Sequence, residues 1–251
     1  VMNIKKNITN ITERIKNATK LYARSPDTVK LLAVSKTKPL TMIQDAYTAG
    51  QRDFGENYLQ DALPKIETLS ADPNYNDIIW HFIGSIQSNK TKTIAENFSW
   101  VHGVDRLKIA RRLGEQRPAE LGNINICIQV NSSKEKSKSG VTLQELPQLI
   151  SEIRDLPGVS LRGLMTIPAN STLTTPESSS VIEKQRKPFR ELHKALEQIN
   201  NNSTHASGST ETDLDTLSMG MSGDLEAAIA EGATIVRVGT DIFGIRETNN
   251  R

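Results

Sequence analysis

The stretch Leu31-Leu32-Ala33-Val34-Ser35-Lys36-Thr37-Lys38-Pro39 joins an apolar run to a lysine and then to a proline. Residues 29–34 are predicted to form a fully buried strand, and Pro39 prevents its continuation. A lysine at the buried end of such a strand is costly unless it is paired, or neutral and reactive. A neutral amine can form a Schiff base with an aldehyde, whereas a lysine that reaches the rim stays charged. By itself the segment favours the charged lysine.

The rest of the chain alternates between helical and strand-like segments. Isoleucines recur at helical spacing from Ile4 to Ile15 and predict an amphipathic first helix. Strands are then predicted at 29–34, 52–55, 78–83, 100–104, 124–130, 159–165, 214–218 and 235–238, and helices at 40–49, 57–69, 89–97, 105–115, 143–155, 181–199 and 223–231, with one turn near 242. Asp105 is predicted to cap the helix that follows it. Such alternation indicates parallel β-α-β units.

About eight of these units in one chain favour a closed barrel. We predict an α/β fold, a (β/α)8 TIM-type barrel with an extra N-terminal helix, formed by residues 1–251 as one domain. An open doubly wound sheet is the alternative, because pattern reading can miscount an element. Polar insertions at about 169–180 and 200–213 are interpreted as mobile loops, the first bordering the site and the second on the opposite face.

Composition limits the classes of function. The formal charge is only +2 and no basic block occurs, so nucleic acid is not an expected partner. No apolar run reaches transmembrane length and the N-terminus does not resemble a signal peptide, so we expect no membrane partner and a cytoplasmic location. The single cysteine, Cys127, lies in an apolar run, which favours a core role over a nucleophilic one. A monomer is expected.

In a barrel of this type the active site forms at the carboxyl ends of the strands. Those ends carry Lys36, Glu56-Asn57, Gly84-Ser85, Met165-Thr166, residues 218–222 and Gly239-Thr240. The loops after the last two strands are where barrels commonly bind phosphate, since glycines there let the backbone approach an anion. Ser222 lies where it can cap a helix N-terminus. Ordinary capped turns are the alternative interpretation of each loop.

A lysine that forms a Schiff base and a separate phosphate site suggest an aldehyde that carries a phosphate. Pyridoxal 5′-phosphate (PLP) fits, and the residues alone leave a class I aldolase acting on a sugar phosphate open. Arg237 lies two residues before Gly239 and points to the same side of the strand. Its acceptor is either the pyridine nitrogen of the ligand or a carboxylate in the barrel.

The histidines are less informative. His81 lies within a predicted strand and could act as a base, but a hydrogen-bonded core histidine is favoured. His102, His193 and His205 show no ligand spacing with an acidic partner, so no metal site is expected. Lys134, Lys136 and Lys138 follow the fifth predicted strand and are interpreted as a solvated loop, with a positive rim that attracts an anion as the alternative.

A set of motifs occurs together and in order along the chain. They are Val34-Ser35-Lys36-Thr37-Lys38-Pro39, Phe54-Gly55-Glu56-Asn57-Tyr58, Trp80-His81-Phe82-Ile83-Gly84 with Gln87-Ser88-Asn89-Lys90, Lys138-Ser139-Gly140, Arg162-Gly163-Leu164-Met165, Leu217-Ser218-Met219-Gly220-Met221-Ser222 and Val236-Arg237-Val238-Gly239-Thr240. Together they resemble the pyridoxal phosphate homeostasis proteins, single-domain relatives of the alanine racemase barrel, over roughly residues 8–246.

The resemblance implies roles for individual residues. Lys36 would be the Schiff-base lysine, with Arg237 near the pyridine nitrogen of PLP and Asn57 near its ring hydroxyl. The phosphate would be held by Ser222, Gly239 and Thr240. The remaining residues expected to contact the cofactor are His81, Met165 and Ser218.

The resemblance also implies a protein that binds PLP and maintains or delivers it within the cell, with little or no catalysis. Alanine racemases have a second domain that supplies a tyrosine base, whereas this chain ends soon after its eighth predicted strand. Racemisation needs a base on each face of the substrate carbon, and only Lys36 is identified. A PLP-dependent amino-acid racemase or related enzyme is the alternative. The expected partners are PLP and, transiently, enzymes that lack their PLP.

Overall fold

The apolar runs of the sequence pair in parallel, each with the next, and the last returns to the first to close a barrel. This computed structural model describes residues 2–132, 138–169, 179–203 and 213–245. Its strands are β1 (Lys30–Val34), β2 (Asp53–Glu56), β3 (Ile79–Phe82), β4 (Trp100–Val104), β5 (Ile124–Gln129), β6 (Val159–Met165), β7 (Thr216–Ser218) and β8 (Ile235–Val238). The predicted barrel is therefore confirmed, and the open sheet is not formed.

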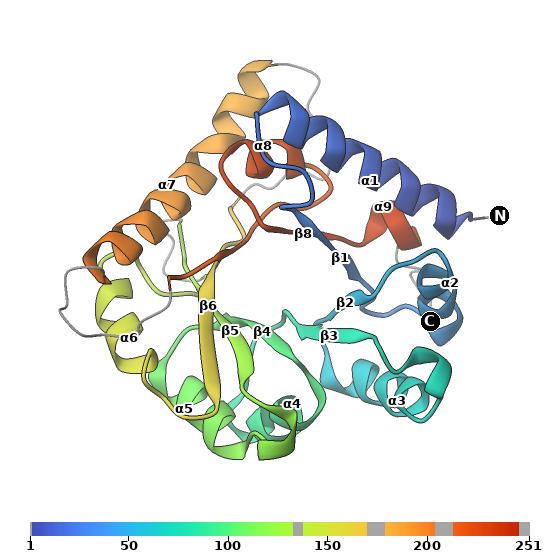
Figure 1. The fold of residues 1–251 in the computed structure, drawn as a ribbon, viewed down its shortest axis with the longest axis horizontal. Coiled ribbons are helices and arrows are strands. Elements are labelled where there is room, and N and C mark those ends of the chain that lie inside the picture. Colours follow the sequence, from blue (N-terminus) through green and yellow to red (C-terminus); the bar gives the residue numbers. More distant parts are fainter. Residues whose placement is uncertain (1, 133–137, 170–178, 204–212, 246–251) are drawn as a thin grey trace.

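Helices surround the strands (Figure 1). They are α1 (Ile4–Leu21), α2 (Leu40–Thr48), α3 (Leu59–Ser70), α4 (Thr91–Asn97), α5 (Leu107–Gln116), α6 (Leu146–Ile153), α7 (Ser179–Ser203), α8 (Leu225–Ala230) and α9 (Thr240–Phe243), with short 3-10 turns at Pro73–Tyr75, Ser88–Lys90 and Ala119–Leu121. Among the described residues, no helix is both long and apolar enough to cross a membrane.

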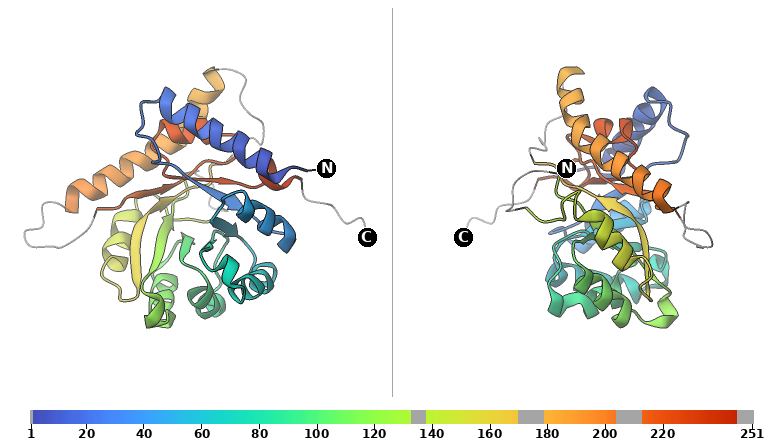
Figure 2. Two further views of the ribbon diagram at one scale, coloured as in Figure 1. Left: turned by 45° about the vertical axis from the view of Figure 1, so that its right-hand side comes forward. Right: turned by 90° about the vertical axis from the view of Figure 1, so that its left-hand side faces the viewer.

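The predicted N-terminal helix is present as α1. Its isoleucines at helical spacing are buried, and the Asn3 side chain caps its start by accepting a hydrogen bond from the Lys6 amide at 3.0 Å. In all views α1 lies on the same side of the barrel as α7, with α8 between them (Figure 2). The apolar stripe of α1 therefore covers the part of the barrel where the first and last strands meet.

The core has two parts, because successive strand residues face opposite sides of the sheet. Ala33, Val236 and Val238 belong to the large outer cluster between the sheet and its helices. Leu32, Trp100, Cys127, Met165 and Ile235 form a small cluster inside the barrel. Burial raises the pKa of the Cys127 thiol to about 12, so the cysteine is an inert core residue, as the sequence indicated.

Two local predictions were wrong. Asp105 does not cap α5, since the helix begins at Leu107 after Arg106; its carboxylate instead contacts the Arg106 guanidinium at 3.3 Å. The second polar insertion was placed at 200–213, but α7 continues to Ser203.

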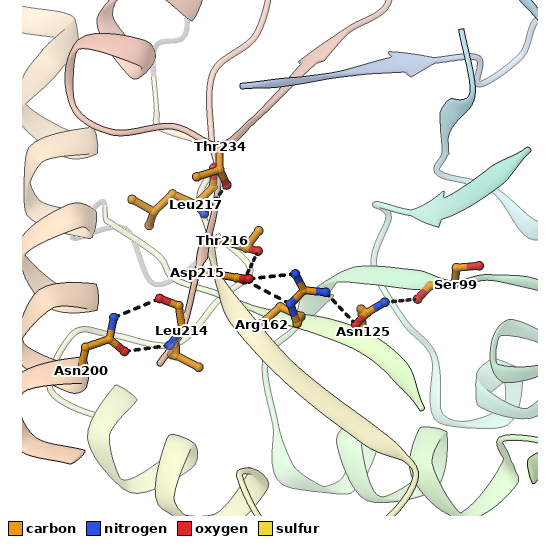
Figure 3. A network of polar contacts seen from close by, with 9 residues as sticks. All are labelled: Ser99, Asn125, Arg162, Asn200, Leu214, Asp215, Thr216, Leu217 and Thr234. Carbon is orange, nitrogen blue, oxygen red and sulfur yellow. Dashed lines mark hydrogen bonds and ion pairs between the residues drawn. The ribbon is translucent and has the colours of Figure 1, made fainter. Parts of the chain in front are cut away.

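Within this extension of α7, the Asn200 amide both donates to and accepts from the backbone of Leu214, at 3.0 and 2.8 Å (Figure 3). An asparagine side chain can satisfy a neighbouring backbone in this way, and it holds the chain entering β7 against the helix. Residues 170–178 of the first insertion and 204–212 of the second lie outside the described residues.

Close approach of β6 and β7 leaves no room for a side chain at Gly163. A Cβ there would lie 1.8 Å from the carbonyl oxygen of Thr216, which is backbone and cannot move aside. We expect Gly163→Ala to lower the free energy of unfolding by about 3 kcal/mol or more. Gly50→Ala is the control: Gly50 has φ +102° but open space around it, so only the conformational cost of about 1 kcal/mol is expected. Equal losses in urea unfolding would contradict the steric argument.

Candidate functional site

A cavity of about 230 Å³ opens at the carboxyl ends of the strands. This volume is below the roughly 300–1,000 Å³ typical of drug-sized pockets, so it suits one compact ligand. Of the predicted site residues, the cavity is lined by Lys36, Asn57, Ser222, Arg237, Gly239 and Thr240. Residues separated by some two hundred positions thus meet because β1 pairs with β8, where Leu32 lies opposite Arg237.

Lys36 is exposed in the structure, so of the two alternatives for this segment the lysine that reaches the rim is observed and the buried, desolvated lysine is not. The reason is local: β1 ends at Val34 and the chain leaves the sheet before the lysine. Thr37 then adopts a positive φ of 63°, a conformation uncommon for a threonine. Within the described part of the chain, the Lys36 amine makes no hydrogen bond or ion pair and faces the cavity mouth as a primary amine open to a ligand.

Among the described residues, the lysine that is buried is Lys65, on α3, and it supports the loop that carries Lys36. Its ammonium donates to the carbonyl oxygens of Ser35 at 3.1 Å and Lys38 at 3.3 Å, one on each side of Lys36. It also lies 2.5 Å from the Glu56 carboxylate and 3.0 Å from that of Asp61. Charge-assisted bonds of this kind are about twice as strong as neutral ones, so the loop is held firmly.

Both acidic partners of Lys65 also hold this loop directly. The Asp61 carboxylate accepts from the amide of Thr37 at 2.6 Å, which stabilises the strained residue beside Lys36. The Glu56 carboxylate accepts from the Ser35 hydroxyl at 3.1 Å. Glu56 is fully buried, and burial raises the pKa of this carboxyl to about 6 even though Lys65 opposes the change. Backbone position at Lys36 therefore depends on charged groups beneath it.

Asn57 enters the cavity from the loop after β2. Its Oδ1 atom is buried and has no hydrogen-bond partner among the described residues, which is costly unless a ligand supplies a donor. Gly84 makes this placement possible, since a Cβ there would lie 2.3 Å from the carbonyl oxygen of Asn57. An unpartnered acceptor that faces a cavity fits a ligand hydroxyl at this position.

Arg237 is almost fully buried at the base of the cavity. Its guanidinium donates to the Ser218 hydroxyl at 2.7 Å and to the carbonyl oxygen of Thr166 at 3.0 Å. Burial lowers the pKa of Arg237 to about 10, so the group is still a cation near neutral pH. The sequence left two acceptors open for Arg237, the pyridine nitrogen of a ligand and a carboxylate in the barrel. Among the described residues, no carboxylate is in direct contact with the Arg237 guanidinium.

Ser222 does not cap a helix, contrary to the prediction. Asp224 occupies the N-cap position of α8, and its carboxylate accepts from the amide of Met221 at 2.7 Å. The loop still approaches β8 closely: Gly220 has φ +99°, and its carbonyl oxygen accepts from the Arg237 amide at 2.9 Å. Ser222 is buried beside this turn and lines the cavity.

Arg14 of α1 contacts the same loop from outside. Its guanidinium donates to the carbonyl oxygen of Ser222 at 2.8 Å and is paired with Glu226 at 2.7 Å and Asp241 at 3.4 Å. These two acidic residues lie on α8 and α9, the helices that follow β7 and β8. One side chain of the N-terminal helix therefore holds both loops that were predicted to bind phosphate.

Three predicted site residues do not line the cavity. Met165 and Ser218 are fully buried, at the ends of β6 and β7. His81 was expected at the pocket by resemblance but is fully buried inside the barrel, where its ring contacts Asp53 at 2.8 Å and His102 at 2.9 Å. The alternative drawn from the residues alone, a hydrogen-bonded core histidine, is confirmed.

Sequence reasoning missed several contributors. The cavity is also lined by Val34, Thr37, Lys38, Ile83, Ile167, Met221 and Gly244. Lys65 had a detectable signal, since it falls on the apolar stripe that Ala62, Ile66 and Leu69 form on α3. A charged residue in such a stripe indicates a buried partner. Lys134 and Lys136 lie outside the described residues.

Larger hollows lie elsewhere. One of about 640 Å³ runs between α6 and α7 on the outside of the barrel. Another, of about 400 Å³, lies between α3 and α4 and shares Asn57 with the site. Neither combines an exposed amine at a strand end with a buried cation, so chemistry rather than volume selects the smaller cavity.

Comparison with known proteins agrees with this choice. The family described as "Alanine racemase, N-terminal domain" matches residues 7–247. The pyridoxal phosphate homeostasis protein of Pseudomonas aeruginosa is 51% identical over 244 residues, covering 97% of this chain and 96% of that protein. The protein of the same name from Escherichia coli K12 is 45% identical, covering 98% and 97%. The structure of PipY from Synechococcus elongatus with PLP bound superposes with a TM-score of 0.73 at 33% identity, covering 92% of this chain and 99% of that one.

The raised pKa of Glu56 predicts a pH dependence of stability. Its carboxyl titrates at about 6 in the folded protein against an ordinary 4.5, so folding favours the protonated form. As the pH rises from below 4.5 to above about 6, the wild type should therefore lose about 2 kcal/mol of unfolding free energy relative to Glu56→Gln. Urea unfolding of both proteins across that range measures the difference. A relative gain with rising pH would mean that pairing with Lys65 outweighs the cost of burial.

Proposed function

Because this chain belongs to the alanine racemase N-terminal domain family, among the pyridoxal phosphate homeostasis proteins, we propose that it binds PLP in the cavity at its strand ends. There it holds PLP as a Schiff base and maintains or delivers it within the cell, with little or no catalysis. The observation that carries this function is the exposed amine of Lys36 at a cavity whose base holds the cation of Arg237. PLP matches both groups, because its aldehyde can react with the Lys36 amine and its pyridine nitrogen can accept a hydrogen bond from Arg237.

The residues present fit each part of the ligand. The Lys36 amine forms the C=N bond with the aldehyde carbon, and water leaves. Asn57 offers a buried acceptor without a described partner to the ring hydroxyl, and Arg237 offers N–H donors to the pyridine nitrogen. The hydroxyls of Ser222 and Thr240 serve the phosphate. At Gly239 a Cβ would lie 3.2 Å from the carbonyl oxygen of Val34, so a side chain there would crowd the site.

The chemistry of the lining supports binding without turnover. Racemisation requires a proton acceptor on each face of the substrate carbon. Among the described residues of the cavity lining, the groups that exchange protons are Lys36 and Lys38, and the Lys38 ammonium donates to the carbonyl oxygens of Gly244 at 2.9 Å and Ile245 at 3.2 Å. An arginine at the pyridine nitrogen also disfavours protonation of that nitrogen, which weakens PLP as an electron sink.

The proposal extends to the domain organisation, oligomeric state, location and partners of the protein. We propose that the whole chain, residues 1–251, forms one PLP-binding domain that acts as a monomer in the cytoplasm. Delivery would involve transient contacts with enzymes that lack their PLP. An exposed Schiff-base lysine suits that task, because a site near the surface lets an acceptor or water reach the bond.

We expect Lys36 to be the residue that PLP modifies. Reduction with borohydride should fix the ligand to the peptide containing Lys36, located by mass spectrometry, and Lys36→Ala should lose the visible absorption band of the bound ligand. Lys38→Ala is the matched control: it removes an amine two residues away that is engaged with carbonyl oxygens, and it should keep the band at saturating PLP. A stable label on another lysine, with Lys36 unmodified, would refute the assignment.

A turnover with any common amino acid in the usual enzyme range of about 1–10³ s⁻¹ would favour the racemase alternative instead. The assay is chiral chromatography of each amino acid after incubation with the PLP-loaded protein. The expected result is no conversion above that of free PLP at the same concentration.

The phosphate assignment has its own test. Charge-assisted hydrogen bonds from Ser222 and Thr240 are each worth about 1.5–3 kcal/mol, so Ser222→Ala with Thr240→Val should weaken PLP binding at least about tenfold. Pyridoxal, which lacks the phosphate, should bind as before. Titrations followed by absorbance give both affinities. Equal weakening of both ligands, or weakening of neither, would show that these hydroxyls do not recognise the phosphate.

A further inference from the structure

A chain of polar side chains crosses the barrel interior, a region that (β/α)8 barrels usually fill with apolar groups. It begins at Arg237, whose guanidinium contacts the Ser218 hydroxyl at 2.7 Å. Ser218 contacts His102 Nδ1 at 2.7 Å, and His102 Nε2 contacts His81 Nδ1 at 2.9 Å. His81 Nε2 then contacts Asp53 Oδ1 at 2.8 Å. Four hydrogen bonds thus connect the base of the cavity with the opposite end of the barrel.

The two ends of this chain determine where its protons lie. An arginine can only donate and an ionised carboxylate can only accept. Since Arg237 donates to Ser218, the hydroxyl proton of Ser218 is free to point to His102 Nδ1, which accepts it. The proton of His102 therefore sits on Nε2 and is donated to Nδ1 of His81. The proton of His81 also sits on Nε2 and is donated to Asp53.

Electrostatics agree with two neutral histidines between two charged ends. Burial lowers the pKa of His81, and it lowers that of His102 to well below its ordinary value. Burial opposes ionisation of Asp53, yet the hydrogen bond from His81 keeps the pKa of this carboxyl below its ordinary value. The Lys30 ammonium, 3.3 Å from Asp53 Oδ1, also favours the carboxylate.

We propose that this directed chain fixes the orientation of the Arg237 guanidinium at the base of the PLP site. His102 holds the Ser218 hydroxyl so that its lone pairs face Arg237, and His81 and Asp53 hold His102 in the tautomer that does so. Asp53, His81 and His102 are then positioning residues that do not contact the ligand. The part of the proposal that concerns PLP rests on the proposed function, whereas the proton arrangement does not.

A second polar network lies at the end of the barrel where Asp53 is found, and it supplies a control for Asp53. Arg162 is paired with Asp215 at 2.9 Å and contacts the Asn125 side chain at 3.1 Å (Figure 3). Its guanidinium also lies over the Trp100 ring, 4.7 Å from the centroid. Among the described residues, no hydrogen bond connects Asp215 to the chain that ends at Asp53. Neutralising either aspartate changes the net charge equally, but only Asp53 terminates the chain.

The proton arrangement is tested first, in the protein without added PLP. The sequence has four histidines, so His193→Gln with His205→Gln leaves only the two of the barrel interior for ¹⁵N NMR. Both rings should be neutral and protonated on Nε2. In Asp53→Asn the amide can donate or accept, so the direction is no longer imposed and Nδ1-protonated rings should appear. An imidazolium or an Nδ1-protonated ring in the protein that retains Asp53 would overturn the proposal.

The effect on the site is tested by comparing Asp53→Asn with Asp215→Asn. Asp53→Asn should weaken PLP and pyridoxal alike by about tenfold, because both ligands carry the pyridine ring, and should shift the visible maximum of bound PLP. Asp215→Asn should change neither quantity. Equal effects of the two substitutions, or no effect of Asp53→Asn, would overturn the positioning role. Failure of the wild type to bind PLP would instead refute the proposed function and leave the NMR result standing.

Discussion

The parallel pairing of β1 with β8 is the constraint on which the other features depend. It closes the barrel and sets Leu32 opposite Arg237, so the loop after the first strand and the loop after the last one share a rim. The Lys36 amine and the Gly239 backbone meet there although some two hundred residues separate them. A site assembled from the two ends of the chain exists only once the whole barrel has formed, which couples ligand binding to complete folding.

Charged groups beneath the cavity then determine its shape. On one side Lys65 holds the backbone around Lys36 through the carbonyl oxygens of Ser35 and Lys38. On the other, the Arg237 guanidinium is hydrogen-bonded to the buried Ser218 hydroxyl, which in turn contacts His102. Replacing a buried ion pair by apolar groups is often neutral or stabilising, and in some proteins such groups instead help to specify one arrangement. The barrel uses them at the two positions where a reactive amine and a cation must face the same small space.

Much of the architecture could be predicted from the sequence, because strand and helix periods depend on local side-chain order. Three strands, β4, β6 and β8, have the predicted bounds. The site was predicted less well. Lys36 is exposed because the chain leaves the sheet after Val34, which no periodicity records. Partners such as Asp61 for Thr37, or His102 for His81, are distant in sequence, so only the fold reveals them.

Helix α1 lies outside the repeating strand–helix units, yet Arg14 binds the carbonyl oxygen of Ser222 and the acidic side chains of the helices after β7 and β8. Thermodynamic linkage makes such a contact reciprocal. If packing of α1 against the barrel favours ligand binding by the loops after β7 and β8, then ligand binding by these loops favours the packing of α1 by the same free energy. The protease resistance of α1 would therefore report whether the cavity is occupied, although no residue of α1 lines that cavity.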